Sequence, residues 1–289
     1  MSLVVVHRSP DAYGGGWSVV SDQLVTFDVH NNHAPVHQAL EHMQLKVIIT
    51  KGRESFVAFA GNLPGQGVAD LLRSLYEIGL GPLALRQRAE DLSRRCGLDF
   101  IVGGWADPTT YRYRQGVEEA IAPDTLSCIG DEVAVESVFV DAYNDASGSI
   151  QQRMETAMRA VIEAREHDTV GGQVLVVHGS DTLSYDAISQ VDFGHVVPRS
   201  LGQGGMQMDS VANGAHIAVG LATTDGYPAI GYWYPRLDLG LLIRPIDSDT
   251  VDRIENVDSE EAMVQRVREQ FGLDLRKGST RIRATTSLR

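Results

Sequence analysis

Three residues in the first quarter of the chain carry groups that could act together on a carbonyl. Lys46 begins an otherwise apolar run, and a lysine seldom lies inside a protein unless it is paired or functional. Gly61 ends the next apolar run, where a backbone N–H with no Cβ beside it can approach a bound group closely. Ser2 follows Met1, and removal of Met1 would leave a serine with both a hydroxyl and a free α-amine. This combination predicts nucleophilic chemistry.

The α-amine of an N-terminal serine can act as the base for its own hydroxyl. Its ordinary pKa is about 8, so about a tenth of it is neutral at pH 7. Because Ser2 is small, we expect Met1 to be removed. The alternative is that Met1 is retained and Ser2 is blocked. Lys46 also has two interpretations, a catalytic cation or a lysine that reaches solvent from the end of a strand.

Two hairpins are expected to hold these residues. The apolar runs Leu3–Val6 and Trp17–Phe27 predict the first hairpin, with a turn-rich segment between them. Leu45–Thr50 and Phe56–Ala60 predict the second, joined by the polar turn 51–55. Lys46 and Gly61 then lie at the start and the end of one hairpin.

The middle of the chain alternates blocks of helices with blocks of strands. Helical apolar spacing is found over 68–78 and 85–96, and again after a capping-box pair formed by Ser149 and Gln152. Further strands are expected at 100–105, 111–113, 126–129, 133–140 and 174–177. Helices grouped between antiparallel hairpins predict an α+β fold of stacked sheet and helix layers.

The composition changes at about residue 185, which predicts three parts: 1–184, a small C-terminal extension over 185–275, and a flexible basic tail over 276–289. The tail could instead be a tether for an acidic surface. Within the extension we expect a glycine-rich loop over 191–213 and a helix capped by Asp258 and Glu261. Strands are expected at 216–223, 230–233 and 239–243.

The overall composition narrows the possible functions. The 289 residues are 43% apolar and carry a net charge of −13, which argues against a nucleic-acid partner. No apolar run reaches the length of a membrane span and no signal peptide precedes the first strand, so a cytoplasmic location without a membrane partner is expected. Cys96 and Cys128 are too few for a disulfide framework, and both are expected to be reduced and buried.

The order of these segments from Ser2 to Val177 resembles the β-type subunits of the proteasome and related bacterial peptidases, which are N-terminal nucleophile (Ntn) hydrolases. In that family the second strand carries an Asp and, four residues later, a Thr, as Asp22 and Thr26 do here. The next strand opens with a Lys, similar to Lys46. The strand after it ends in Ala-Gly before the first helix, as at Gly61. A late Gly-Gly before a strand is similar too.

The resemblance implies a four-layer αββα Ntn sandwich and an endopeptidase or amidohydrolase that matures by autoprocessing. Ser2 would be the nucleophile in place of the family's usual threonine, with Lys46 stabilising its alkoxide and Asp22 orienting Lys46. The Gly61 N–H would bind the oxyanion, while Thr26 and the backbone near Gly61 would hold a peptide or protein substrate as an added strand. The resemblance also implies homo-oligomeric rings or helical stacks and no cofactor.

Two other outcomes stay open for the same scaffold. An incoming amine in place of water would make the enzyme a peptide ligase, and a retained Met1 would make the chain a non-catalytic structural or assembly subunit. We expect no metal site, because the histidine run at His30, His33, His37 and His42 has no accompanying cysteine or convincing carboxylate. The pattern favours a solvated helical segment there.

Overall fold

The first sheet contains both strands of the predicted first hairpin. The structure is a computed structural model of the chain, described over residues 3–10, 15–23, 45–61, 68–77, 82–105, 109–164, 170, 174–179, 182–193, 196–200, 206–210, 215–248 and 251–278. Its strand order is β10-β9-β2-β1-β8, and every neighbouring pair is antiparallel. The strands are β1 (Leu3–Ser9), β2 (Gly16–Asp22), β8 (Leu126–Gly130), β9 (Val174–Gly179) and β10 (Ser184–Ala187).

The second sheet contains the predicted second hairpin and follows the order of the chain, β3-β4-β5-β6-β7. The hairpin closes as expected: Thr50 N–H donates to Ser55 O at 2.9 Å, and Arg53 takes a positive φ of 60° in the turn. The strands are β3 (Val47–Ile49), β4 (Ser55–Ala60), β5 (Asp99–Gly104), β6 (Thr110–Arg114) and β7 (Val117–Ile121).

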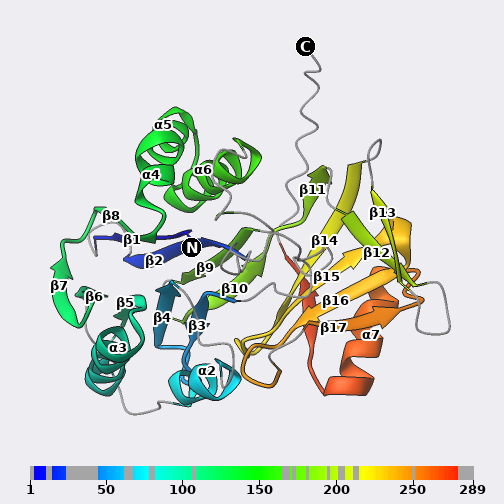
Figure 1. Cartoon of the computed structure of the whole chain (residues 1–289), viewed down its shortest axis with the longest axis horizontal. Coiled ribbons are helices and arrows are strands. Elements are labelled where there is room, and N and C mark those ends of the chain that lie inside the picture. The colour runs from blue at the N-terminus through cyan, green and yellow to red at the C-terminus, as the bar shows by residue number, and fades with distance from the viewer. Residues whose placement is uncertain are drawn as a thin grey trace.

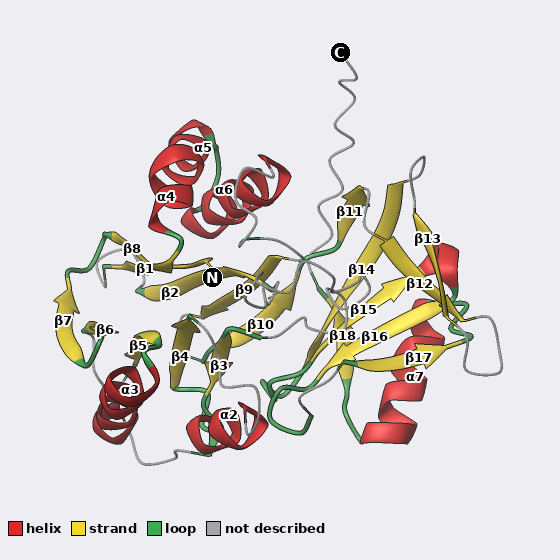
Figure 2. Ribbon diagram, in the orientation of Figure 1, coloured by secondary structure: helices red, strands yellow, loops and turns green. Residues whose placement is uncertain are grey.

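Side-chain alternation along β1 shows how the sheets and helices pack. Leu3 and Val5 belong to a buried cluster with Met154 and Met158 of helix α6, whereas Val4 and Val6 belong to the cluster that includes β4 and β5. One face of the first sheet therefore meets α6 and the other meets the second sheet, whose far side is covered by α2 and α3 (Figure 2). The helices are α2 (Val68–Tyr76), α3 (Pro82–Cys96) and α6 (Ile150–Ala164).

The segment after β10 forms a third sheet of order β11-β14-β15-β16-β17, with β18 paired to β14 (Figure 1). Tyr232, Leu241 and other residues of this sheet share the main core with the two stacked sheets, while α7 packs on its other face. The division into parts at 184 stays a prediction. The elements are β11 (Gln190–Phe193), β14 (Ala215–Thr223), β15 (Ile230–Tyr234), β16 (Leu239–Ile243), β17 (Asp252–Glu255), β18 (Leu275–Lys277) and α7 (Glu260–Phe271).

The strand predicted over 133–140 is wrong, because this segment is helical: α4 (Glu132–Ala134), a π-helical turn (Val135–Phe139) and α5 (Val140–Asp145). The run contains β-branched residues that suggest a strand. However, Phe139, Ala142 and Tyr143 recur at helical spacing and pack on the α6 cluster. Ser137 Oγ also donates to the Val133 carbonyl one turn back, at 2.7 Å. Tertiary packing decided the conformation here.

Other local predictions were partly right. The segment 191–213, expected to be a loop, contains most of β11 and a hairpin of β12 (Val196–Ser200) with β13 (Met206–Ser210). Strands β7 and β17 were not predicted. Ser259, not Asp258, is the N-cap of α7, accepting from Ala262 N–H at 3.2 Å. Cys96 is exposed and Cys128 is half-buried, so the expectation that both thiols are buried is wrong.

The capping box of α6 is confirmed by its two reciprocal bonds. Ser149 N–H donates to Gln152 Oε1 at 3.0 Å, and Gln152 N–H donates to Ser149 Oγ at 3.3 Å. The α+β class is confirmed as well, since helices and antiparallel sheets make up the described residues. None of the described helices has the length and apolar character needed to cross a membrane.

Candidate active site

Two of the predicted site residues, Asp22 and Lys46, meet at the start of β1. Lys46 Nζ lies 2.7 Å from Asp22 Oδ2, and the side chains are 2% and 0% exposed. The other oxygen, Asp22 Oδ1, accepts the Leu3 N–H at 2.8 Å. One carboxylate therefore bonds both the lysine ammonium and the amide through which Ser2 joins the chain.

The strands explain this meeting. Asp22 is the last residue of β2, and the β1–β2 register pairs Val4 with Ser21, so Asp22 lies opposite the start of β1. Lys46 immediately precedes β3, and its carbonyl accepts Phe59 N–H of β4 at 2.9 Å. The backbone of Lys46 is thus held by the hairpin in the second sheet, while its side chain reaches a carboxylate of the first.

Burial determines the electrostatics of this pair. It lowers the pKa of Lys46 below its usual value, and the charge and hydrogen bond of Asp22 act in the opposite direction. A lysine whose pKa is lowered in this way takes and gives a proton more readily near neutral pH than an exposed lysine does. The pair can therefore serve as a shared proton site as well as a structural ion pair.

Gly61 follows the last residue of β4 and has a φ of +123°, a conformation that side-chain-bearing residues rarely adopt. A Cβ built at this position would lie 3.1 Å from a methyl carbon of Leu98. The backbone requirement that the sequence suggested for Gly61 is therefore present. Its proposed role as an oxyanion donor depends on the direction of its N–H toward a substrate and stays a prediction.

Several predicted residues lie outside the part of the chain that the structure describes. They include Ser2 and Thr26 of the proposed site. The histidine run and the Gly-Gly before β9 are outside it as well: His30, His33, His37, His42, Gly171 and Gly172. Within the described residues, no group of three or more His, Cys, Asp or Glu side chains is arranged to hold a metal ion.

Two buried residues near the pair were missed at the level of sequence. Tyr185 of β10 is 1% exposed and hydrogen-bonds the backbone of β3, directly after Lys46. Gln23, the neighbour of Asp22, is fully buried. No sequence pattern marks either residue. Tyr185 bonds a strand more than a hundred residues earlier in the chain, and Gln23 lies directly after the end of β2.

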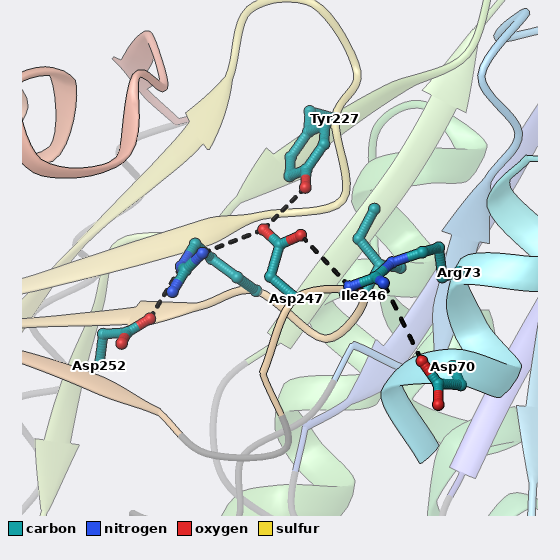
Figure 3. Close-up of polar contacts among 7 residues, drawn as sticks. Asp70, Arg73, Tyr227, Ile246, Asp247 and Asp252 are labelled. Carbon is teal, nitrogen blue, oxygen red and sulfur yellow. Dashed lines mark hydrogen bonds and ion pairs between the residues drawn. The ribbon is translucent and has the colours of Figure 1, made fainter. Parts of the chain in front are cut away.

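A second polar cluster lies between α2 and the third sheet (Figure 3). Asp247 accepts from Tyr227 Oη at 2.7 Å and from Arg244 Nη1 at 3.0 Å. Arg244 Nε donates to Asp252 at 2.8 Å, and Arg73 of α2 donates to the Ile246 carbonyl at 2.9 Å. Its carboxylates are paired with arginines, and Arg73 links α2 to the segment after β16, so we interpret this cluster, named the joint, as a structural contact between elements.

A scan of protein-family models and a search of curated proteins find no match to the chain. Among solved structures it is similar to a Gly-1 mutant of Anbu from Hyphomicrobium sp. strain MC1, with a TM-score of 0.47 and 16% identity, covering 65% of this chain and 86% of that one. It is also similar to HslV from Trypanosoma brucei, with a TM-score of 0.43 and 17% identity, covering 61% of this chain and 98% of that one. For BPH from Thiobacillus denitrificans in complex with epoxomicin, the TM-score is 0.44 and the identity 13%, and the match covers 62% of this chain and 99% of that one. With TM-scores below 0.5, function has to be argued from the chain's own contacts.

Proposed function

We propose that the chain is a proteasome-like Ntn peptidase with a four-layer αββα fold, in which Ser2 becomes the N-terminal nucleophile after Met1 is removed. The observation that carries the proposal is the buried Asp22 carboxylate, which bonds Lys46 Nζ at 2.7 Å and Leu3 N at 2.8 Å. This contact puts a lysine of the second sheet beside the first described residue of β1.

In the proposed reaction, Ser2 Oγ attacks the carbonyl carbon of a peptide bond while the α-amine of Ser2, directly or through a water, takes the hydroxyl proton. The tetrahedral oxyanion is stabilised by the Gly61 N–H; removing one such donor typically raises the barrier by about 3–4 kcal/mol. The same proton then passes to the leaving amine as the C–N bond breaks. Water attacks the resulting ester, releasing the acid and restoring the Ser2 hydroxyl.

Lys46 and Asp22 support the nucleophile in this scheme. The Lys46 ammonium stabilises the alkoxide that develops on Ser2, and Asp22 orients that ammonium. Thr26 and the backbone near Gly61 hold the substrate as an added strand. No cofactor takes part, and we propose a homo-oligomeric assembly on the basis of the same family resemblance.

The first test is the intact mass of the purified protein. A mass lacking Met1 supports the free α-amine that the reaction needs. A mass that retains Met1 contradicts the proposed peptidase and leaves the non-catalytic structural subunit as the remaining function.

The second test is acylation by a peptide with an electrophilic C-terminus, followed by mass spectrometry. Ser2→Ala should abolish labelling, and Lys46→Ala should slow it at least about a hundredfold, as expected for loss of a charge that acts on the transition state. Lys51→Ala is the matched control, because Lys51 lies in the turn of the same hairpin but is 63% exposed and pairs with Glu77. Equal labelling in Ser2→Ala and the parent protein would falsify the chemistry.

A further inference from the structure

Among the described strands β3 is an edge of the second sheet, and a side chain bonds the backbone groups on its outer side. Because Phe59 N–H donates to the Lys46 carbonyl, the backbone groups of Val47 and Ile49 point away from β4. Ile49 N–H donates to Tyr185 Oη at 2.7 Å, and the same hydroxyl donates to the Val47 carbonyl at 3.2 Å. A single tyrosine thus satisfies two groups of a buried strand edge.

The hydroxyl of Tyr185 is well suited to this double role. Tyr185 is 1% exposed, so no bulk water competes for the two backbone groups. Burial raises the pKa of Tyr185 far above its ordinary value, so the hydroxyl keeps its proton and can always donate. The outer edge of the strand directly following Lys46 is therefore held by one buried hydroxyl.

The same segment also holds the tip of the hairpin. Leu183 N–H donates to the Arg53 carbonyl at 2.9 Å, and Arg53 Nε donates back to the Leu183 carbonyl at 2.9 Å. Arg53 Nη2 donates to Ser184 Oγ at 2.7 Å. Residues 183–185 consequently clamp the hairpin at its turn and along its edge.

The third sheet packs against β10, the strand that carries Tyr185. A Cβ at Gly220 of β14 or at Gly278 would collide with the Ala187 carbonyl of β10, so these backbones are in close contact. Gly220 N–H also donates to Ser189 Oγ at 3.0 Å. Figure 1 shows β10 between β3 and this sheet. The C-terminal sheet therefore supports the strand that carries Tyr185.

We propose that Tyr185 is a positioning residue for Lys46, and that the C-terminal sheet maintains this position by packing against β10. The hydroxyl keeps β3 in place, and β3 determines how far Lys46 can extend toward Asp22. The catalytic meaning of this position rests on the proposed function. The effect on Lys46 itself does not, because the Lys46–Asp22 contact exists whatever reaction the protein performs.

The test is Tyr185→Phe, which removes the hydroxyl and keeps the ring, with Lys46 Nζ titrated by NMR. Loosening β3 should admit water and raise the pKa of Lys46 toward its ordinary value, and the Ile49 amide should lose protection from hydrogen exchange. Each pKa unit lowers the neutral fraction of Lys46 about tenfold. In an active protein, labelling by the electrophilic peptide should also slow, because the ammonium that stabilises the Ser2 alkoxide is no longer held in position.

Tyr113→Phe is the matched control. Tyr113 is also fully buried in the second sheet, and its hydroxyl bonds Glu118 at 2.6 Å. It should lower the melting temperature without moving the Lys46 titration. Arg53→Ala is a second variant, which releases the hairpin tip and should shift the titration in the same direction by less.

An unchanged Lys46 titration in Tyr185→Phe overturns the proposal; if that variant does not fold, an unchanged titration in Arg53→Ala overturns it. A protein that shows the shift but no Ser2-dependent labelling retains the positioning role and loses the peptidase function. The two hypotheses can therefore fail separately.

Discussion

Two regions of the molecule join aspartates to basic side chains in different surroundings. Asp22 and Lys46 are 0% and 2% exposed, whereas Arg244, Asp252 and Asp247 of the joint are 17%, 26% and 30% exposed. In the buried pair, desolvation is the largest influence on the lysine, and its pKa is lowered. In the joint, water screens the charges and shared hydrogen bonds determine the geometry. Burial is what makes the first region a candidate for catalysis.

The largest expected effect is on the buried pair. Lys46→Met removes the ammonium beside a buried carboxylate, so the free energy of unfolding should fall by about 3–5 kcal/mol. Urea denaturation measures this change. Lys46→Met combined with Asp22→Asn should recover more than half of the loss, because an amide oxygen can still accept the Leu3 N–H. A single-variant loss below about 1 kcal/mol would show that the pair behaves like a surface ion pair.

The joint should respond more weakly to loss of its central carboxylate. Asp247→Ala removes the acceptor of Tyr227 and one acceptor of Arg244, and it should lower the free energy of unfolding by about 1–2 kcal/mol. Tyr227→Phe in the same background should have almost no further effect, because its partner is already gone. A full additional loss in the double variant would contradict the energetic coupling expected from the Tyr227–Asp247 hydrogen bond drawn in Figure 3.

The coupling energies of the two regions should depend differently on salt. Raising the ionic strength from about 0.05 to 0.5 M should weaken the Arg244–Asp252 coupling by a few tenths of a kcal/mol, since both groups contact solvent. The Lys46–Asp22 coupling should stay constant, because mobile ions do not reach it. Double-mutant cycles at the two salt concentrations measure both values. Equal salt sensitivity would indicate that water enters the buried site.

The smallest expected effect concerns His7 of β1. Burial lowers the pKa of His7 below 6.5, with Asp124 opposing the shift and Arg153 adding to it. Between the lowered pKa and 6.5 the unfolded chain binds a proton that the folded protein does not, so stability falls as the pH falls through this window. His7→Gln should therefore lose less unfolding free energy than the parent protein between pH 7.5 and pH 5. Urea denaturation at both values measures the difference.

The sequence predicts those features whose cause is local. The hairpin of Lys46 and Gly61, the stripes of α2 and α3 and the Ser149–Gln152 capping box all follow from spacing and turn chemistry within one segment. The sequence placed Lys46 at the head of an apolar run but left open whether its side chain is paired inside or reaches solvent, and the structure buries it.

The pairing of Asp22 with Lys46 was predicted only through the family resemblance, and their 2.7 Å contact depends on how two sheets stack. Tyr185 was not predicted at all, since its partners lie 136 and 138 residues away. The helix over 132–145 replaced a predicted strand because packing on α6 outweighed local β preference. Local spacing can determine which face of a segment is apolar, whereas only tertiary packing decides which distant face it meets.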